Sequence, residues 1–430
     1  MVARAYKEHR QIKVIGSKHS YNDSWDSKDM LISMKNFKRI FKIDKKNNRV
    51  KCEAGVSISE IALELHKNGF TLTTAGSFGE QTIAGAISTG THGFSREGGL
   101  LSELVVEMEI IDGKGEIHDI TKEKDLRAFR LSLGTLGIIT KVTLQITPLD
   151  KYCTFEIDST PQNIVYNNLE TDVQSNKHIR YLLNQFNPDY FTVIKINEVN
   201  IQSIRKNAIR RRVHFVPGGK EYIPVFLVLL TKLFLTNRYI IKYVLRSAST
   251  KIHIKNYFLY DTGIFIRGDL ANNHPVIGRL VYNALKTNAE YNSEIAINPN
   301  TFEIFNRKFI TLLKKYQKND SQFNAQLAGR FLGGNASALL AANYHSSVLF
   351  IDVHIYKNCS HVHEFLKEIE DFAMDNCEGK MHWGKMIMNS KERVLKNYTN
   401  ESITTFTNYK IKYDPGNVFS NNYTRRLFGF

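Results

Sequence analysis

Short segments in which hydrophobic and polar residues alternate predict a set of β-strands in the N-terminal third of the chain. They are residues 11–15, 41–44, 49–54, 104–111 and 116–120. The second and third segments flank KKNN and the last two flank the turn DGKG, so each pair is expected to form a hairpin. The sequence GTLGIITKVTLQITP then predicts a long strand that ends at Pro148.

Helices are predicted between some of these strands. Ser57 and Glu60 form a capping-box pattern, the apolar residues within 58–65 recur on one face, and Gly69 supplies a stop. A shorter helix is expected near residues 122–131. This succession predicts an α+β domain whose ligand lies along loops at the strand ends.

The composition changes near residue 150, where glycines become fewer and long aliphatic and aromatic residues more frequent. We expect a second domain there, built from a mixed sheet with helices covering it. One of its strands, QLAGRFLGG, contains Arg330, and another, SVLFIDVHIY, contains His354. Residues 363–373 show the periodicity of an amphipathic helix.

A dense run of small residues lies in FTLTTAGSFGEQTIAGAISTGTHGFS, residues 70–95. Such a segment cannot fill a core, but it lets backbone N–H groups approach a ligand closely, and its glycines supply positive-φ freedom. A diphosphate would suit it, and a glycine-rich surface loop is the alternative interpretation. The spacing matches neither a Walker loop nor a Rossmann fingerprint.

The net charge of +16 raises the question of whether the protein binds nucleic acid. The basic residues are spread along the chain, with their densest cluster in residues 205–212, and no nucleic-acid motif accompanies them. A basic surface exposed to solvent is therefore the preferred interpretation of the charge. Binding to an anionic membrane ranks second, and binding to nucleic acid ranks third. The four cysteines contain no C-x-x-C pair, which argues against a disulfide framework or a zinc site.

Residues 222–245 form the most apolar segment, but Lys232, Asn237, Arg238 and Lys242 interrupt it. It falls short of the run of about 20 apolar residues that spans a bilayer, so we expect a buried or interfacial helix. The N-terminus has no apolar core of signal-peptide length. We expect a cytoplasmic protein, with peripheral membrane association as an open possibility.

Four motifs together resemble one family of flavoenzymes. TIAGAISTGTHG and IGSKHSYND resemble the two flavin-binding segments of FAD-linked oxidoreductases of the vanillyl-alcohol oxidase type, and HWGK and DPGNVFSNNYTRRL resemble the C-terminal signature of their aldonolactone oxidase and alditol oxidase branch. The resemblance implies a two-domain fold: an FAD-binding domain at 1–149, a substrate or cap domain at 150–380, and a segment at 381–430 that returns to the flavin. The family's first strand and helix look shortened here.

The resemblance also implies the cofactor-binding residues. His19 matches the histidine that binds FAD covalently in many members of the family. The other expected contacts are Gly16, Ser17, Lys18, Ser20, Tyr21, Gly76, Thr82, Gly85, Ala86, Ser88, Thr89, Gly90, Thr91, His92, Gly93, Gly137, Ile138, Ile139 and His382. No metal ligands are implied.

Lys385 of HWGK resembles the family lysine beside the flavin's pyrimidine edge, and Arg330 resembles the arginine that binds the reacting oxygen. His354 is a candidate base. Family members commonly carry Glu two residues before this arginine, whereas this chain has Ala328. Glu294 could reach the pocket from a neighbouring strand.

The resemblance implies an FAD-dependent oxidase whose substrate is an aldono-1,4-lactone of the L-gulono or D-arabinono type. In such a reaction a hydride passes to flavin N5, and molecular oxygen reoxidises the flavin to give hydrogen peroxide. An alditol oxidase is the close alternative. A catalytically impaired FAD-binding protein is another, because of Ala328. The expected partners are a small sugar lactone or polyol and oxygen.

Overall fold

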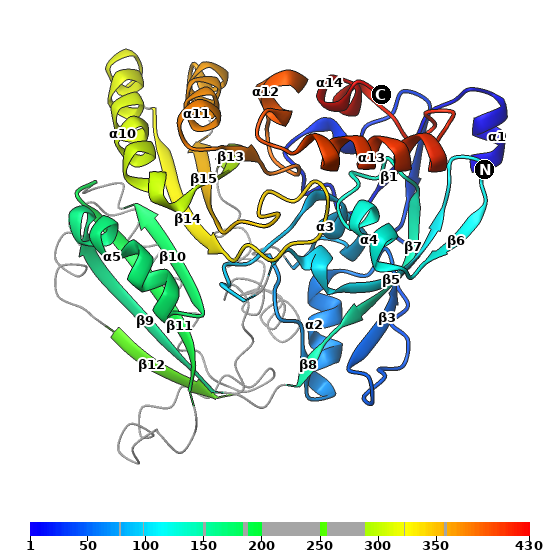
Figure 1. The fold of residues 1–430 in the computed structure, drawn as a ribbon, viewed down its shortest axis with the longest axis horizontal. Helices are drawn as coiled ribbons and strands as arrows, with labels where there is room; N and C mark the ends of the chain where they lie inside the picture. Colours follow the sequence, from blue (N-terminus) through cyan, green and yellow to red (C-terminus); the bar gives the residue numbers. More distant parts are fainter. Residues whose placement is uncertain are drawn as a thin grey trace, which may run out of the picture.

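The computed structural model describes residues 1–76, 79–97, 99–148, 152–183, 188–199, 250–255, 289–321, 323–356 and 359–430. Two β-sheet regions with their helices lie on opposite sides of the molecule, and the C-terminal helices run along one edge of both (Figure 1). The expected helix within residues 222–245 and the basic cluster at 205–212 fall outside the described residues. Among the described helices, none combines the length and apolar character needed to cross a membrane.

The N-terminal region contains a parallel pair of strands and a four-stranded sheet. The pair is β1 (Ile12–Ile15) and β2 (Met30–Ser33), preceded by α1 (Val2–Lys7). The sheet has the order β3-β7-β5-β6 and is antiparallel. Its strands are β3 (Arg49–Glu53), β5 (Val105–Ile111), β6 (Ile117–Ile120) and β7 (Ile138–Gln145).

Most of the predicted N-terminal elements are confirmed. Helix α2 (Ile58–Lys67) begins with a complete capping box between Ser57 and Glu60. Helices α3 (Ile83–Thr89) and α4 (Glu123–Phe129) follow, and β4 (Phe70–Thr71) pairs with β8 (Thr147–Pro148). The predicted strand at 41–44 is wrong, because only isolated bridges such as Asp44 to Arg49 form there.

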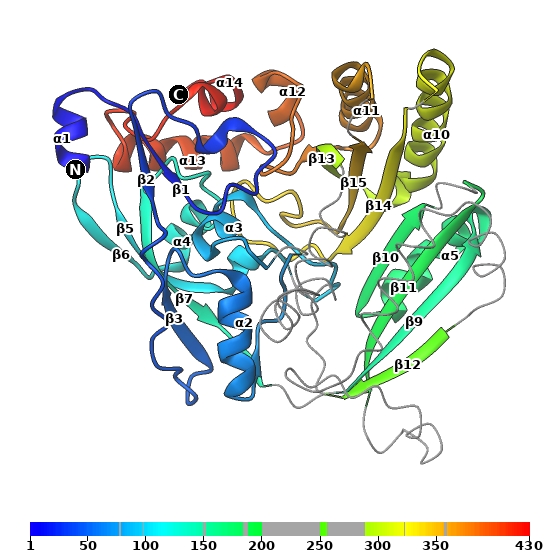
Figure 2. The same ribbon diagram turned by 180° about the vertical axis from the view of Figure 1, so that it is seen from behind.

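The larger sheet has eight strands in the order β12-β9-β11-β10-β14-β15-β13-β16. They are β9 (Tyr152–Pro161), β10 (His178–Leu183), β11 (Tyr190–Val199), β12 (Thr250–Lys255), β13 (Ala289–Ile297), β14 (Ala325–Leu332), β15 (Val348–Tyr356) and β16 (Lys380–Met381). Figure 2 shows β9 to β12 on the side of the molecule away from the four-stranded sheet.

We expected a mixed sheet, but every pair of neighbouring strands in this described sheet is antiparallel. The reason lies in two helical crossovers. Helix α5 (Gln162–Ser175) connects β9 to β10, and α10 (Phe302–Asn319) connects β13 to β14. In each case a later strand, β11 or β15, is inserted between the two that the helix connects, so each strand meets only antiparallel neighbours.

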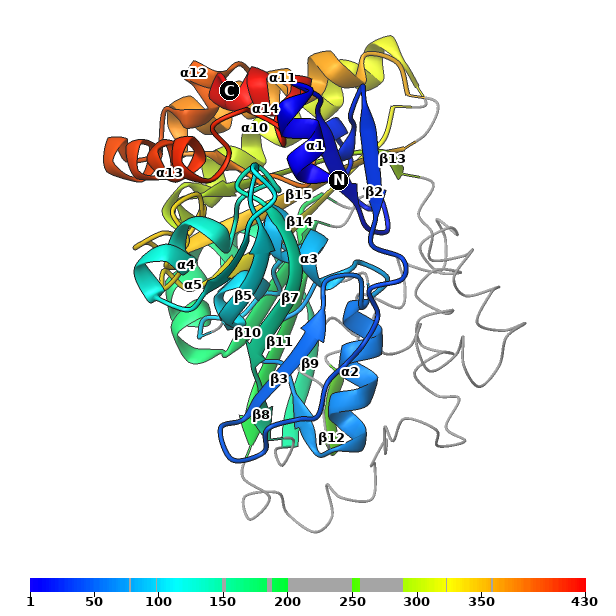
Figure 3. The same ribbon diagram turned by 90° about the vertical axis from the view of Figure 1, so that its right-hand side faces the viewer.

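The C-terminal segment packs back on the N-terminal region. After α11 (Val362–Asn376) come α12 (Lys391–Leu395), α13 (Asn400–Tyr413) and α14 (Asn422–Phe428), which Figure 3 shows at the same end of the molecule as α1. Val418 and Phe419, between α13 and α14, share a hydrophobic cluster with Val2 and Ala5 of α1. The Asn421 side chain caps α14 and also donates hydrogen bonds to the backbone carbonyls of Asp23 and Asp26, both at 2.8 Å. The two ends of the described chain therefore build one structural unit around β1.

Candidate active site

An elongated cleft lies where the turn after β1 faces α3 and the beginning of β7. Its wall is made of small residues and a few polar ones. The predicted residues that line it are Gly16, Ser17, Lys18, His19, Ser20, Thr82, Gly85, Ala86, Ser88, Thr89, Gly137, Ile138 and Ile139. The structure therefore brings together most of the residues that the sequence marked for the cofactor.

Close backbone packing shapes this cleft. A Cβ atom built on Gly16 would overlap Thr82 Oγ1, so a side chain at position 16 would collide with the residue that precedes α3. The Ser17 hydroxyl donates a hydrogen bond of 2.5 Å to the carbonyl of Glu80. These contacts join the two glycine-containing segments that the sequence placed far apart, and they leave a backbone-lined wall suited to a large ligand.

Sequence reasoning missed Lys13, which also lines the cleft. The Lys13 side chain is buried, and its ammonium donates a 3.3 Å hydrogen bond to the carbonyl of Leu133. Burial and the nearby Lys410 lower the pKa of Lys13 to about 7, and Asp414 opposes this only in part. An anionic group in the cleft would favour the charged form of Lys13. No signal in the sequence pointed to it, because alternation places Lys13 opposite Ile12 and Val14, whereas the structure buries both Ile12 and Lys13.

The cleft continues beyond His19 toward Tyr21, His382, Gly384 and Lys385. The backbone N–H of Tyr21 donates a 2.9 Å hydrogen bond to the carbonyl of Gly384. The Lys385 ammonium lies 5.0 Å from the centre of the Tyr21 ring, within the range of a cation–π contact. HWGK and the first turn thus form one wall of the site.

One face of the larger sheet carries the remaining candidates. Ala328 on β14 pairs with Asp352 on β15, and Asp352 pairs in turn with Glu294 on β13. Because side chains alternate between the two faces of a strand, residues two positions away lie on the same face. Ala328, Asp352 and Glu294 thus form one row across the three strands. Arg330 and His354 lie on the same face of the sheet as this row. Glu294 contacts Arg330, although β15 separates their strands, and its reach into the substrate pocket stays a prediction.

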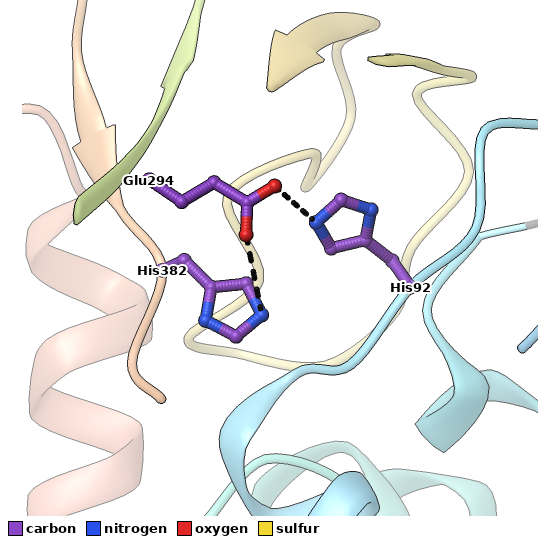
Figure 4. Close-up of side chains that lie close together, drawn as sticks. All are labelled: His92, Glu294 and His382. Carbon is purple, nitrogen blue, oxygen red and sulfur yellow. Dashed lines mark ion pairs between the residues drawn. The ribbon is translucent and has the colours of Figure 1, made fainter. Parts of the chain in front are cut away.

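Glu294 is fully buried and lies between His92 and His382 (Figure 4), with Arg330 as a third basic neighbour. One carboxylate oxygen accepts a hydrogen bond from Arg330 and lies 3.3 Å from His92 Nε2, and the other lies 4.0 Å from His382 Nε2. Burial is the largest single effect and works against the ionised form, but Arg330 and His92 together outweigh it and hold the pKa of Glu294 well below its usual range. Burial lowers the pKa of His382 to about 3 and also lowers that of His92, so both imidazoles are neutral at pH 7.

The cluster of His92, Glu294 and His382 contains the atom types of a metal site, all within 4.8 Å of one another. The positive Arg330 already neutralises the same carboxylate, which disfavours a divalent cation at this position. A buried charge pair flanked by neutral imidazoles is the better description of this cluster.

A second polar cluster adjoins the first. The Lys385 ammonium donates a hydrogen bond to the side-chain oxygen of Asn292, whose amide nitrogen donates to Asp352 at 2.5 Å. His354 Nε2 lies 2.9 Å from the other oxygen of Asp352, and His354 Nδ1 lies 3.2 Å from the Asn292 amide nitrogen. Arg330 and Lys385 lie 3.7 and 3.9 Å from Asp352. The three predicted catalytic residues thus converge on a carboxylate that sequence reasoning did not mark.

Some predicted cofactor contacts lie beside the cleft instead of lining it. Gly76 is held against the Thr91 side chain, Gly90 ends α3 with a φ of 78°, and the Gly93 N–H donates to Thr74 Oγ1 at 3.1 Å. These residues, with His92, connect α3 to the Glu294 cluster. Their predicted contact with a cofactor stays a prediction.

Comparison with known sequences and structures shows which proteins this chain resembles. A profile described as FAD binding domain matches residues 1–121, and one described as D-arabinono-1,4-lactone oxidase matches residues 275–427. The chain is 35% identical over 193 residues to the D-arabinono-1,4-lactone oxidase of Kluyveromyces lactis, a match covering 42% of this chain and 35% of that protein. With the L-gulonolactone oxidase of Mus musculus it shares 28% identity over 42% of each chain. The chain thus matches less than half the length of these two relatives.

A longer match is found with the L-gulono-1,4-lactone dehydrogenase of Mycobacterium tuberculosis, at 24% identity over 100% of this chain and 93% of that protein. Among solved structures, cholesterol oxidase from Brevibacterium sterolicum superimposes with a TM-score of 0.72 at 13% identity, covering 99% of this chain and 91% of that one. The Physcomitrella patens BBE-like 1 structure gives a TM-score of 0.68 at 16% identity, covering 97% and 87% of the two chains.

The fold is therefore that of an FAD-linked oxidoreductase of the vanillyl-alcohol oxidase type. Within that class, the matches of residues 275–427 and of the two lactone oxidases are those of the aldonolactone oxidase family, which the chain resembles. The expected family and fold class are confirmed, while the expected division into domains stays a prediction.

Proposed function

We propose that this protein is an FAD-dependent oxidase of aldono-1,4-lactones of the L-gulono or D-arabinono type. The observation that carries the proposal is the position of Lys385. It lines the end of the predicted FAD cleft and also lies 3.9 Å from Asp352 on the polar face of the larger sheet. A substrate on that face would thus meet the cleft where Lys385 and Arg330 supply positive charge.

The lining of the cleft fits FAD. The close packing of Gly16 on Thr82 leaves a backbone wall, the buried Lys13 gives a cation for an anionic ligand, and His19 lies between the two parts of the cleft. When bound there, FAD would supply a hydride acceptor at flavin N5, which oxygen then regenerates with formation of hydrogen peroxide. We further propose that His19 forms the covalent link to the cofactor.

The side chains of the site have separate proposed roles in the reaction. Lys385 would stabilise negative charge that develops beside it during the reaction, and Arg330 would bind the reacting oxygen of the substrate. His354 is the proposed acceptor of the hydroxyl proton. Both of its ring nitrogens are engaged, by Asp352 and Asn292, so the substrate must replace one of these contacts before His354 can take the proton.

The test is anaerobic mixing of the purified yellow protein with L-gulono-1,4-lactone, D-arabinono-1,4-lactone and a polyol such as xylitol in separate experiments. We expect either lactone to bleach the flavin absorbance, and admission of air to restore it with release of hydrogen peroxide. Bleaching by the polyol alone would replace the proposal with an alditol oxidase. A spectrum unchanged by all three compounds would instead indicate a catalytically impaired FAD protein.

A further inference from the structure

The side chain of Asp352 lies at the centre of the polar face although no motif pointed to it. It is 6% exposed, and it lies within hydrogen-bonding distance of His354 Nε2 at 2.9 Å and of the Asn292 amide at 2.5 Å. Its neighbours across the strands are Ala328 on one side and Glu294 on the other. Since Ala328 has no polar atom in its side chain, Asp352 is the first carboxylate that a group beside β14 would meet in this row.

The two carboxylates of this row have different environments. Glu294 is 0% exposed and accepts the direct hydrogen bond from Arg330, between two neutral imidazoles. Asp352 instead lies near three potential cations, with Arg330 at 3.7 Å, Lys385 at 3.9 Å and His354 at 2.9 Å. Glu294 thus neutralises Arg330, and Asp352 connects that pair to Lys385.

We infer that Asp352 is a positioning residue of the active site, which orients His354 and holds Lys385 and Arg330 in fixed relation to each other. This inference deepens the proposed function and rests on it. Without the Asp352 carboxylate, Lys385 would lose a nearby counter-charge, Arg330 would keep Glu294, and His354 would lose the acceptor that fixes its ring. The burial of Asp352 makes the effect strong, because little water can replace its charge.

The charge balance around Asp352 leads to a test that needs no lactone. Sulfite is an anion that adds reversibly to protein-bound flavin and bleaches it, and its affinity rises with positive charge beside the ring. In Asp352→Asn, which preserves shape and removes the charge, Lys385 and Arg330 lose a counter-charge. We expect sulfite to bind roughly tenfold more tightly, as for the loss of one partly screened charge a few ångströms away.

Lactone turnover should change in the opposite direction. We expect kcat of Asp352→Asn to fall on the order of 100-fold, the effect of misplaced catalytic groups, with a smaller change in KM. A residue needed only for folding would weaken sulfite binding and turnover together. Asp352→Glu keeps the charge while moving it, so its sulfite affinity should stay within about twofold of the wild type while its turnover falls.

The control is Asp119→Asn, which removes an exposed carboxylate from β6 and should leave both measurements unchanged. The inference is overturned if Asp352→Asn keeps wild-type turnover and sulfite affinity, or if both Asp352 variants fail to fold with flavin. Because sulfite reports on the site without a substrate, the expected sulfite result would stand even if no lactone were oxidised, which separates this inference from the proposed function.

Discussion

Asn22 donates a hydrogen bond of 2.7 Å to the backbone carbonyl of Lys385, across 363 positions of the chain. The same amide group donates to the carbonyl of Trp383 at 2.8 Å and to the Tyr423 hydroxyl at 2.9 Å. A single side chain thus joins the turn after β1, the HWGK segment and α14. The position of the Lys385 side chain therefore depends on a residue near the N-terminus.

Replacing Asn22 by Ala should destabilise the protein by about 1–3 kcal/mol, because three partly buried partners lose their donor or acceptor. Thermal unfolding of the FAD-loaded protein measures this. Asn47→Ala, which removes an exposed amide bound to Asp44, is the control and should change the melting temperature little. Equal melting temperatures for Asn22→Ala and wild type would contradict this account.

His19→Ala should release FAD when the protein is precipitated with acid, whereas the wild-type pellet should stay yellow. The expectation follows from the place of His19 in both parts of the cleft and from the proposed covalent link. Absorbance of supernatant and pellet is the measurement. His66→Ala, on the last turn of α2, serves as a control and should keep its yellow pellet. A colourless wild-type pellet would show that the flavin is not covalent.

FAD affinity should fall as the pH rises above about 7. Lys13 has a pKa lowered to about 7 by burial, so it is largely neutral at pH 8.5 in the empty cleft. An anionic ligand favours the protonated form, and binding then requires uptake of a proton, which weakens affinity by up to about tenfold per pH unit. Titration of a His19→Ala variant with FAD at pH 6.5 and 8.5 measures the effect without a covalent bond.

Adding Lys13→Met to that variant should lower FAD affinity at pH 6.5 and abolish most of the pH dependence. Lys46→Met, at an exposed position, is the matched control and should retain it. An unaltered pH dependence in the Lys13→Met variant would assign the proton to another group.

Glu370→Gln should stabilise the protein at pH 8. Glu370 is fully buried on α11, and burial raises its pKa to about 7 despite hydrogen bonds from Ser293, Met388 and Asn389. The folded protein therefore binds the proton more tightly than the unfolded chain. Its contribution to the free energy of unfolding is fully present below the ordinary glutamate pKa of 4.5 and is lost as the pH rises to about 7, by up to about 1.4 kcal/mol per pH unit.

Glutamine has no such titration: its oxygen can accept the bonds from Met388 and Asn389, and its amide nitrogen can donate to the Ser293 hydroxyl. The advantage of Glu370→Gln over wild type should therefore grow between pH 5 and pH 8. Urea unfolding at both pH values measures it. Glu401→Gln, at an exposed position, should show no such trend. A constant difference between Glu370→Gln and wild type across the pH range would exclude a raised pKa at Glu370.

The sequence predicted local elements well where cap or turn residues marked the ends of an element. The capping box at Ser57 and the turn DGKG gave correct elements because those signals act over a few residues. The segment 41–44 does meet β3 through antiparallel bridges at Asp44–Arg49 and at the adjacent Ile40–Cys52, but these bridges are isolated and do not extend into a strand, whereas β3 forms its continuous pairing with β7. The order of the eight-stranded sheet was likewise not predictable, since insertion of β11 and β15 between connected strands leaves no local signal.

Residues of the candidate site could be predicted where a recognised sequence motif contained them. His19, Lys385 and Arg330 were found by resemblance, and the structure places the first two along one cleft and Arg330 on the adjoining sheet face. Lys13 and Asp352 were missed because each lies in an ordinary strand, where a charged residue is usually solvent-exposed. Only the tertiary fold shows that both are buried beside the cleft.

The hydrogen bonds from Asn421 to the carbonyls of Asp23 and Asp26 have a consequence for biosynthesis. These carbonyls belong to the turn that follows His19, yet their partner lies 398 and 395 positions further along the chain and is synthesised much later. The turn that follows His19 therefore lacks these two hydrogen bonds until Asn421 has been translated. Stable loading of the flavin should accordingly come only after the chain has been synthesised beyond Asn421.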